Sequence, residues 1–348
     1  MPGCLFGDTG YSDEELVMKM ILILFFALAI CFFFSFWNGF TDAAYAISTV
    51  IGTRTLKPIQ AVGMATVGNF IGLIFGSAVA LTVGTGIISG SIISGEVIIA
   101  TLIGALIFDV IVSWIFSMPI SETHVLIGGL VGAGLAVGGI SVVNIQGIIS
   151  KVVIPMLLVP VISLFLVFLL TLLIVKFFRK FSANAANRYS RRLQIASSFY
   201  FSVTEGTNGA QKTMGIITTL LVYYGLLSAF KVPLWVMIGA YACLSLGTFL
   251  GGWRVVKTMA TKITKLKPYQ GFSAELGSGL ILTTTALLGF PVSSTHVSNG
   301  AIMGVGLTRG AKSVKWITTR RIVTAWILSM PLAAVFSFTV YKVLTLFL

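Results

Sequence analysis

Long apolar stretches separated by short polar ones recur along the whole chain. Residues 18–37, 152–175 and 323–348 are the clearest examples, and each is long enough for a helix that crosses the roughly 30 Å hydrocarbon core of a bilayer. These stretches do not alternate apolar and polar residues, as the roughly ten-residue strands of a membrane barrel do. The pattern therefore predicts an all-α polytopic membrane protein.

The polar loops between the apolar stretches differ in charge. Basic residues gather in four of them: 53–57, 176–192, 254–267 and 309–321. Three others carry little or no positive charge: 84–96, 138–148 and 224–232. Because Lys and Arg concentrate in the cytoplasmic loops of membrane proteins, this alternation predicts the topology and places both termini outside.

The predicted topology has five crossings in each half of the chain. They are 17–51, 58–86, 95–118, 119–139 and 149–176, then 193–224, 232–253, 268–290, 291–308 and 322–347. Equivalent crossings run in opposite directions, as in the inverted repeats of secondary transporters, whose binding site lies at the repeat interface near the midplane. The predicted parts are an external tail (1–16), repeat 1 (17–176), a basic cytoplasmic loop (177–192) and the inverted repeat 2 (193–348).

The first predicted crossing, 17–51, is too long for one straight helix through a bilayer. At 1.5 Å per residue it would extend over roughly 50 Å, so it must tilt strongly or break. The favoured point for a break is "WNGF" (37–40). An acidic "DEE" precedes this segment and no small-residue cleavage site follows it, so we interpret it as a retained helix and not as a secretory signal.

Composition supports a membrane location. Hydrophobic residues make up 57% of the chain and charged residues 9%, with a mean hydropathy of +1.02. The net charge of +13 reflects basic residues in the short loops that set topology, so the expected partner is the lipid bilayer and not a nucleic acid. The three cysteines are scattered, with neither disulfide nor metal-binding spacing.

Two similar heptapeptides lie at matching points of the two halves, "PISETHV" (119–125) and "PVSSTHV" (291–297). Pro disfavours helix at the residue before it, and Ser and Thr cap helix starts, so each motif predicts a helix break and a new N-terminus at membrane depth. Helix N-termini bind anions through free N–H groups and the helix dipole. The alternative is structural, with Ser and Thr bonding to neighbouring helices and Gly allowing close packing.

Acidic side chains within apolar segments are expensive and indicate functional sites. Five carboxylates lie within or at the edges of such segments: Asp42, Asp109, Glu122, Glu205 and Glu275. Asp42 in "NGFTDAAYAIST" (38–49) and Glu205 in "TEGTNGAQKTMG" (204–215) occupy equivalent crossings. Each of these two stretches has a Gly within a polar cluster, which is the pattern expected of a broken helix.

Other polar residues have two interpretations each. Glu275 is either functional or an ordinary acid of a first helical turn, and Lys212 either neutralises Glu205 or faces a substrate. His124 and His296 are either packed, hydrogen-bonded elements of their turns or members of a proton relay.

The chain resembles the inorganic phosphate transporter (PiT) family in four linked motifs that span nearly its whole length. "NGFTDAAYA" and "EGTNGAQK" are similar to the two copies of a signature whose commonest form reads GANDVANA, and both heptapeptides are similar to the family's Ser/Thr-His segments. Thr41, Tyr45 and Gly209 depart from the commonest form and resemble the bacterial low-affinity branch. The resemblance implies a sodium/phosphate symporter of a prokaryotic plasma membrane, not an enzyme, with broken or re-entrant helices meeting at a midplane site.

The resemblance and the oxygen-rich motifs together imply two sets of site residues. The expected phosphate-binding residues are Ser121, Thr123, Asn208, Gln211, Ser293, Ser294 and Thr295. The expected Na⁺ ligands are Asn38, Thr41, Asp42, Ser121, Glu122, Glu205, Asn208 and Ser293. Asp109 is either a structural acid or a ligand of a peripheral cation site. Oxygen ligands suit a hard cation such as Na⁺. No resident cofactor is expected, because the coupling ion (Na⁺ or H⁺) is itself transported.

Two rival functions stay open at this point. The nearer one is an H⁺-coupled phosphate or metal–phosphate transporter, or a sulfate permease, on the same scaffold. The other is an intramembrane serine protease in which His296 activates Ser293 or Ser294, although a duplicated Ser/His cluster has no use in a single catalytic site. The sequence is compatible with a homo-oligomer and does not specify one.

Overall fold

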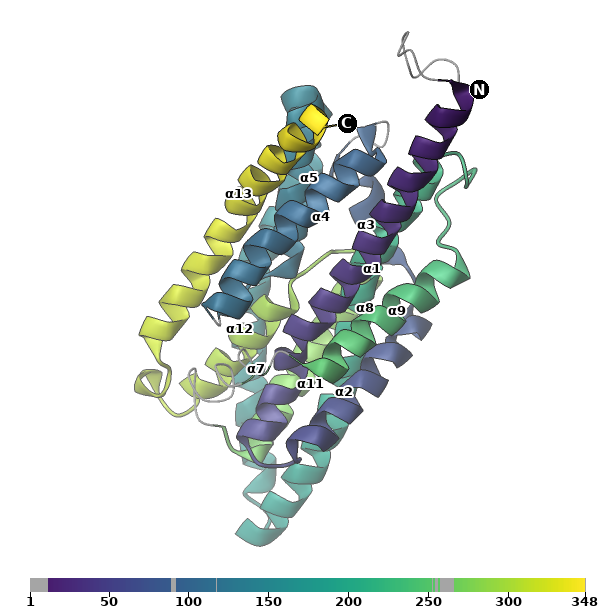
Figure 1. The fold of residues 1–348 in the computed structure, drawn as a ribbon. Helices are drawn as coiled ribbons and strands as arrows, with labels where there is room; N and C mark the ends of the chain where they lie inside the picture. Colours follow the sequence, from purple (N-terminus) through teal and green to yellow (C-terminus); the bar gives the residue numbers. More distant parts are fainter. Residues whose placement is uncertain are drawn as a thin grey trace.

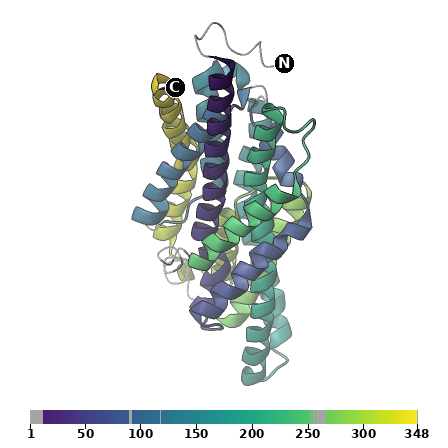
Figure 2. The same cartoon turned by 45° about the vertical axis from the view of Figure 1, so that its right-hand side comes forward.

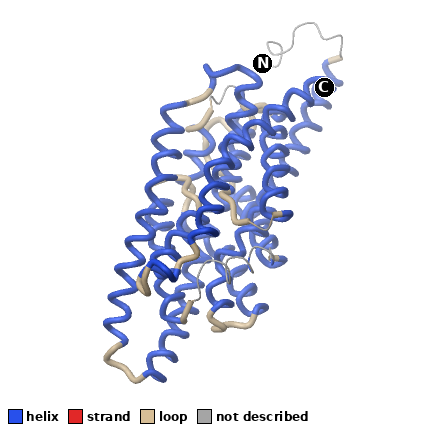
Figure 3. The backbone as a smooth tube through the Cα atoms, turned by 90° about the vertical axis from the view of Figure 1, so that its left-hand side faces the viewer, coloured by secondary structure: helices blue, strands red, loops and turns tan. Residues whose placement is uncertain are grey.

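The structure is a computed structural model that describes residues 12–88, 92–116, 118–251, 253, 256 and 266–347. Within these residues it is built from helices, with one isolated bridge between Ile88 and Val143 and no strands (Figure 3). Six helical segments are long and apolar enough to cross a membrane. The predicted all-α membrane fold is therefore confirmed. The predicted external tail and the basic stretch 254–267 lie mostly outside the described residues.

The helices form one elongated bundle in which α1 begins and α13 ends at the same end of the molecule (Figure 1). Their bounds are α1 (Asp13–Gly52), α2 (Pro58–Ile71), α3 (Ala78–Thr85), α4 (Gly95–Asp109), α5 (Glu122–Gly138), α6 (Ile145–Ile148), α7 (Ile154–Phe178), α8 (Ala183–Tyr223), α9 (Leu234–Leu250), α11 (Pro268–Leu287), α12 (Ser294–Leu307) and α13 (Trp316–Phe347). A 3₁₀ segment (Gly72–Phe75) extends α2, and π-helical segments extend α4 to Ile115 and precede α7 at Ile149–Val153.

Helices α4 and α5 form a hairpin that enters and leaves at one end of the molecule. The chain just before α4 is bonded to the chain just after α5, because the backbone N–H of Asn144 donates to the carbonyl of Ile87 at 3.0 Å. Helices α11 and α12 form the matching hairpin from the opposite end (Figure 1). The segments predicted as crossings at 95–118 and 119–139, and at 268–290 and 291–308, are thus paired in the structure as two hairpins.

Helices α1 and α8 are continuous through the polar clusters that were expected to break them. Each has about 40 residues and spans most of the bundle (Figure 2). The predicted breaks at 37–40 and in 204–215 were wrong. No Pro interrupts either stretch, and other helices bury both polar clusters. The glycines serve close packing instead, because Gly39 lies against the backbone of Leu244 and Gly206 against that of Asn69.

The two halves of the chain repeat the same packing with their partners exchanged. In the hairpins, Gly128 and Gly132 of α5 lie against the backbone of Met330 and Ala334 in α13, and Gly300 and Gly304 of α12 against that of Pro160 and Leu164 in α7. Gly39 and Gly206 make an analogous pair between α1 and α9 and between α8 and α2. Matched contacts between oppositely directed hairpins support the predicted inverted repeat. In this arrangement the last helix of each half supports the hairpin of the other.

The connection between the halves is shorter than the predicted basic loop 177–192. Helix α7 ends at Phe178 and α8 begins at Ala183, where Ser182 caps the helix by accepting from the N–H of Ala185. Residues 183–192 are therefore helical, and only the turn 179–182 separates the two elements. A Ser followed by residues of good helix propensity is sufficient to start a helix at this point.

Candidate functional site

The tips of the two hairpins start new helices inside the protein, as the heptapeptides predicted. Ser121 caps α5 by accepting from the N–H of His124 at 3.2 Å, and Ser293 caps α12 by accepting from the N–H of His296 at 3.4 Å. Both serines are at most 5% exposed. Two helix N-termini, with their free N–H groups, are thus buried among other helices.

The two tips are bonded to each other by a reciprocal pair of hydrogen bonds. Thr123 donates to the carbonyl of Val292 at 3.2 Å, and Thr295 donates to the carbonyl of Ile120 at 2.6 Å. Because each threonine occupies the same slot of its heptapeptide, the contact has the symmetry of an inverted repeat. The predicted meeting of re-entrant elements is observed, and both Thr hydroxyl hydrogens are used to join the tips.

Helix α1 contributes Asn38, Thr41 and Asp42 to the region beside the tips. Thr41 donates to a carboxylate oxygen of Glu122, and Ser294 donates to Asp42 at 3.5 Å. Each of these side chains is buried. Helix α1 therefore contacts both hairpins: Thr41 bonds to Glu122 of the first hairpin, and Asp42 bonds to Ser294 of the second.

Helix α8 contributes four polar side chains from one stretch, Glu205, Asn208, Gln211 and Lys212. The amide N–H of Asn208 donates to the carbonyl of Val292 at 2.7 Å, and the Lys212 ammonium donates to Thr123 at 3.2 Å. The side-chain oxygen of Gln211 accepts from a backbone N–H of α3 at 2.8 Å. Lys212 therefore contacts a hairpin tip and also interacts electrostatically with Glu205.

Several buried polar atoms of this cluster have no hydrogen-bond partner in the described part of the chain. They are both polar atoms of the Asn38 amide, both carboxylate oxygens of Glu205, one oxygen each of Asp42, Glu122 and Asn208, and the amide nitrogen of Gln211. Buried polar groups in folded proteins are nearly always bonded, so a cluster of unbonded ones indicates a ligand site. Most of these atoms are oxygens, which are ligands for a hard cation.

The cluster contains more negatively charged groups than positively charged ones. Asp42, Glu122 and Glu205 supply three carboxylates, which interact electrostatically with one another and with the single ammonium of Lys212. No three Asp, Glu, His or Cys side chains in the described ranges converge closely enough to hold a metal ion by themselves. A bound cation would therefore also need amide, hydroxyl or backbone oxygens.

Every predicted site residue is buried, with at most 5% of its surface exposed. Asp109 lies next to the cluster, close to Glu122, and accepts a hydrogen bond from the indole of Trp37 at 2.9 Å. The sequence left Glu275 as either functional or an acid of a first helical turn, and the second interpretation was wrong. It lies within α11 and accepts hydrogen bonds from Thr49 and from Ser197, a pairing that needs three helices to be positioned.

The histidine rings pack among aromatic groups. The rings of His124 and His296 are edge to face at 4.6 Å, and His296 also lies 3.9 Å from the ring of Trp326. The hydroxyl of Ser293 is bonded to the backbone N–H of His296 and not to its ring. This is a helix cap and not the nucleophile–base contact that a serine protease requires.

Sequence reasoning did not assign a role to Tyr45. Its hydroxyl donates to the carbonyl of Ile120 at 3.3 Å, so one carbonyl at the first tip accepts from both Tyr45 and Thr295. Tyr45 lies one helical turn after Thr41 on α1. Residues four positions apart lie on the same face of a helix, so the spacing from Thr41 is the sequence signal that could have identified Tyr45.

The fold and the site together define a polytopic membrane protein in which two opposed hairpins enclose an oxygen-rich polar site. The chain belongs to the Phosphate transporter family, whose sequence profile matches residues 38–189 and 179–337. The members of this family are transporters and not enzymes.

Relatives over nearly the full length agree with this assignment. The probable low-affinity inorganic phosphate transporter of Rhizobium meliloti (strain 1021) is 46% identical over 331 residues, which cover 94% of this chain and 98% of that protein. The protein of the same description in Bacillus subtilis (strain 168) is 36% identical over 337 residues, with coverage of 94% and 99%. A solved structure, the sodium-dependent phosphate transporter, matches with a TM-score of 0.83 and 26% identity, covering 94% of this chain and 100% of that one.

Proposed function

We propose that the protein imports inorganic phosphate across a prokaryotic plasma membrane by symport with Na⁺. The observation that carries the proposal is the position of unbonded buried oxygens next to two opposed helix N-termini. The helix N-termini offer N–H groups to an anion, whereas the oxygens suit a cation. The description of the solved relative as sodium-dependent supports the choice of Na⁺.

The orientations of the side chains divide the two roles. Gln211 bonds through its oxygen and leaves its amide nitrogen without a partner, so it presents donors to phosphate. Asn208 does the reverse and leaves its oxygen unbonded, so it fits the cation. Ser121 and Ser293 accept hydrogen bonds from backbone N–H groups, so their own hydroxyl hydrogens can point to phosphate.

The carboxylates make phosphate binding depend on the cation. Two unit negative charges about 6 Å apart at an effective dielectric of about 20 repel by about 3 kcal/mol. Asp42, Glu122 and Glu205 face a single neutralising group, Lys212, so phosphate meets an excess of negative charge. A Na⁺ ion between carboxylate and phosphate turns that repulsion into attraction, and the resulting coupling between the two sites is reciprocal.

The exchanged packing of the two halves supports alternating access. Each hairpin lies against a helix of the other half, through glycines that allow its backbone to approach closely. Movement of one half relative to the other would shift both hairpins together and open the site to one side at a time. This is the behaviour of inverted repeats around a central site.

We expect purified protein to bind phosphate more tightly as Na⁺ concentration rises, because Na⁺ removes the electrostatic repulsion. One carboxylate–phosphate pair of about 3 kcal/mol corresponds to roughly a 100-fold change in Kd. Equilibrium binding of ³²P-phosphate in Na⁺ and in choline buffers measures this change in the phosphate Kd. By reciprocity, phosphate must increase the affinity for Na⁺ by the same factor. Equal affinity in both buffers contradicts Na⁺ coupling. Tighter binding on acidification without Na⁺ would favour H⁺ coupling, and competition by sulfate would identify a sulfate permease.

A further inference from the structure

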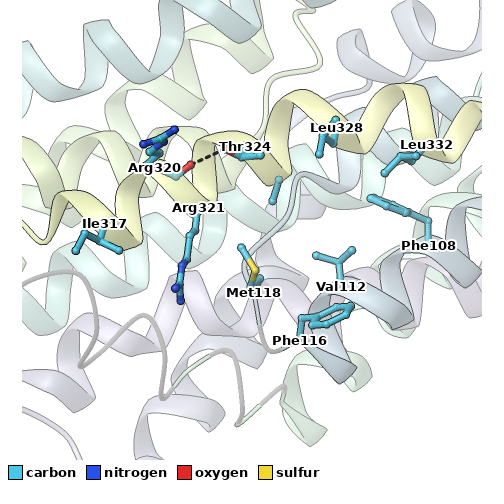
Figure 4. Close-up of a pocket in the computed structure, with 11 residues that line it drawn as sticks. Phe108, Val112, Phe116, Met118, Ile317, Arg320, Arg321, Thr324, Leu328 and Leu332 are labelled. Carbon is cyan, nitrogen blue, oxygen red and sulfur yellow. Dashed lines mark hydrogen bonds between the residues drawn. The ribbon is translucent and has the colours of Figure 1, made fainter.

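A groove outside the site lies between the tip of α4 and the first half of α13 (Figure 4). Its volume is about 570 Å³, and Phe108, Val112 and Phe116 form one wall, with Leu328 and Leu332 opposite. The groove exists because the α4–α5 hairpin turns back inside the protein. The part of α13 beyond the hairpin tip therefore has no neighbour from α4 along one side.

Charge is confined to one end of this groove. Figure 4 shows Arg320 and Arg321 at the end near the start of α13, and Phe108 and Leu332 at the other end. The two guanidinium groups leave the helix in different directions, so they flank the mouth of the groove. The result is a long apolar channel with two cations at one end.

No carboxylate in the described part of the chain is available to neutralise these arginines. Of the nine acidic residues that the structure describes, Asp13, Glu14 and Glu15 begin α1 and Glu96 begins α4, at the opposite end of the molecule. The remaining five are buried in the interior: Asp42, Asp109, Glu122, Glu205 and Glu275. None of the described carboxylates is therefore the counter-ion of Arg320 and Arg321, which leaves this pair of charges open to an anion from outside the chain.

The dimensions match one leaflet of a bilayer. From Arg320 to Leu332 the helix rises by about 18 Å at 1.5 Å per residue, and one leaflet of the hydrocarbon core is about 15 Å thick. Exposed apolar side chains line the groove, with Phe116 64% and Leu328 46% exposed. These side chains are suited to acyl chains, and with them in one leaflet the mouth and its two arginines would lie at the depth of the head groups.

We propose that this groove binds one anionic glycerophospholipid. Its phosphate lies at the mouth that Arg320 and Arg321 flank, and one acyl chain lies along α13 between Phe108 and Leu328. Arginine suits a phosphodiester because its planar fork matches two phosphate oxygens. The bound lipid would contact the hairpin through Met118, which precedes the "PISETHV" motif, and so would support the tip from outside the transport site.

The test is lipid retention by the delipidated protein, measured by native mass spectrometry with phosphatidylglycerol and phosphatidylcholine of identical chains. We expect phosphatidylglycerol to bind at least about tenfold more tightly than phosphatidylcholine, because two arginines flank its net negative head group. The variant R320Q/R321Q should lose this preference, whereas R179Q/K180Q, with equal charge loss at an exposed turn, should keep it. Equal binding of the two lipids by the unmodified protein, or equal loss in both variants, would overturn the proposal.

A second variant tests the apolar part of the groove and does not depend on the arginines. Leu328→Trp places a large ring in the channel while both guanidinium groups stay, so phosphatidylglycerol retention should fall although the charge is unchanged. Normal retention by this variant would refute the position of the acyl chain. Complete displacement of the lipid by excess inorganic phosphate would also refute the proposal, because the arginines would then form a site for the free anion. Gel filtration and thermal unfolding confirm that each variant is folded.

Discussion

Replacing Asp42 by Asn should abolish Na⁺-dependent phosphate binding and leave the protein folded. The substitution keeps the volume of the side chain and an oxygen that accepts from Ser294, and it removes only the charge. Na⁺ then loses a carboxylate ligand at a buried position. The roughly 100-fold increase in phosphate affinity that Na⁺ causes should therefore disappear. The measurement is the phosphate Kd in Na⁺ and in choline buffers, which should become nearly equal in the variant.

The same variant has a second readout in its thermal stability. A ligand that binds only the folded state stabilises it by about 2.7 kcal/mol at 100 times its Kd. Na⁺ should therefore raise the unfolding temperature of the unmodified protein and not that of Asp42→Asn. Asp13→Asn, which removes an exposed carboxylate at the start of α1, is the matched control and should behave like the unmodified protein. A Na⁺ response in Asp42→Asn equal to that of the control would refute the assignment of Asp42.

Replacing Gly39 by Val should destabilise the whole bundle. A Cβ atom at this position would meet the backbone carbonyl of Leu244, and no change of rotamer moves a backbone atom away. Forcing extra atoms into a packed interface typically costs about 1–3 kcal/mol, with larger values where the backbone must move. Helices α1 and α9 would separate, and the adjacent Asn38 would move with α1. Thermal unfolding in detergent, followed by intrinsic fluorescence, should show a clear decrease in the midpoint.

The control for this prediction is Gly63→Val in α2. Nothing lies within 4 Å of a Cβ atom built at Gly63, so the same substitution meets open space there. Val has a better helix propensity than Gly, and the variant should be as stable as the unmodified protein or slightly more so. If the two variants unfolded at the same temperature, the close approach of α1 and α9 would not be a feature of the protein in solution.

Much of the architecture could be predicted because hydropathy and loop charge depend on local sequence. The apolar segments, the capped starts at Ser121 and Ser293 and the duplication of the heptapeptides are all visible in the printed residues. The wrong predictions share one physical cause. A polar Gly-containing stretch such as 37–40 looks like a helix break when it is considered alone, whereas in the structure Leu244, more than 200 residues away, explains the glycine.

The re-entrant hairpins also depend on contacts that sequence does not display. A segment of about 20 apolar residues is compatible with a full crossing, whereas the bonds of Thr123 and Thr295 join the two tips among other helices of the protein. The site residues were predicted by type and not by orientation. Which atom of Asn208 or Gln211 faces the site depends on partners in distant helices, Val292 and Val79.

The central claim is that the carboxylates of the interior site make phosphate transport depend on Na⁺. The most direct measurement is uptake of ³²P-phosphate into proteoliposomes that contain the purified protein, with an inward Na⁺ gradient imposed at constant pH. We expect phosphate to accumulate above its external concentration and to leave again when the Na⁺ gradient is collapsed by an ionophore. Uptake that does not respond to the Na⁺ gradient would contradict the account.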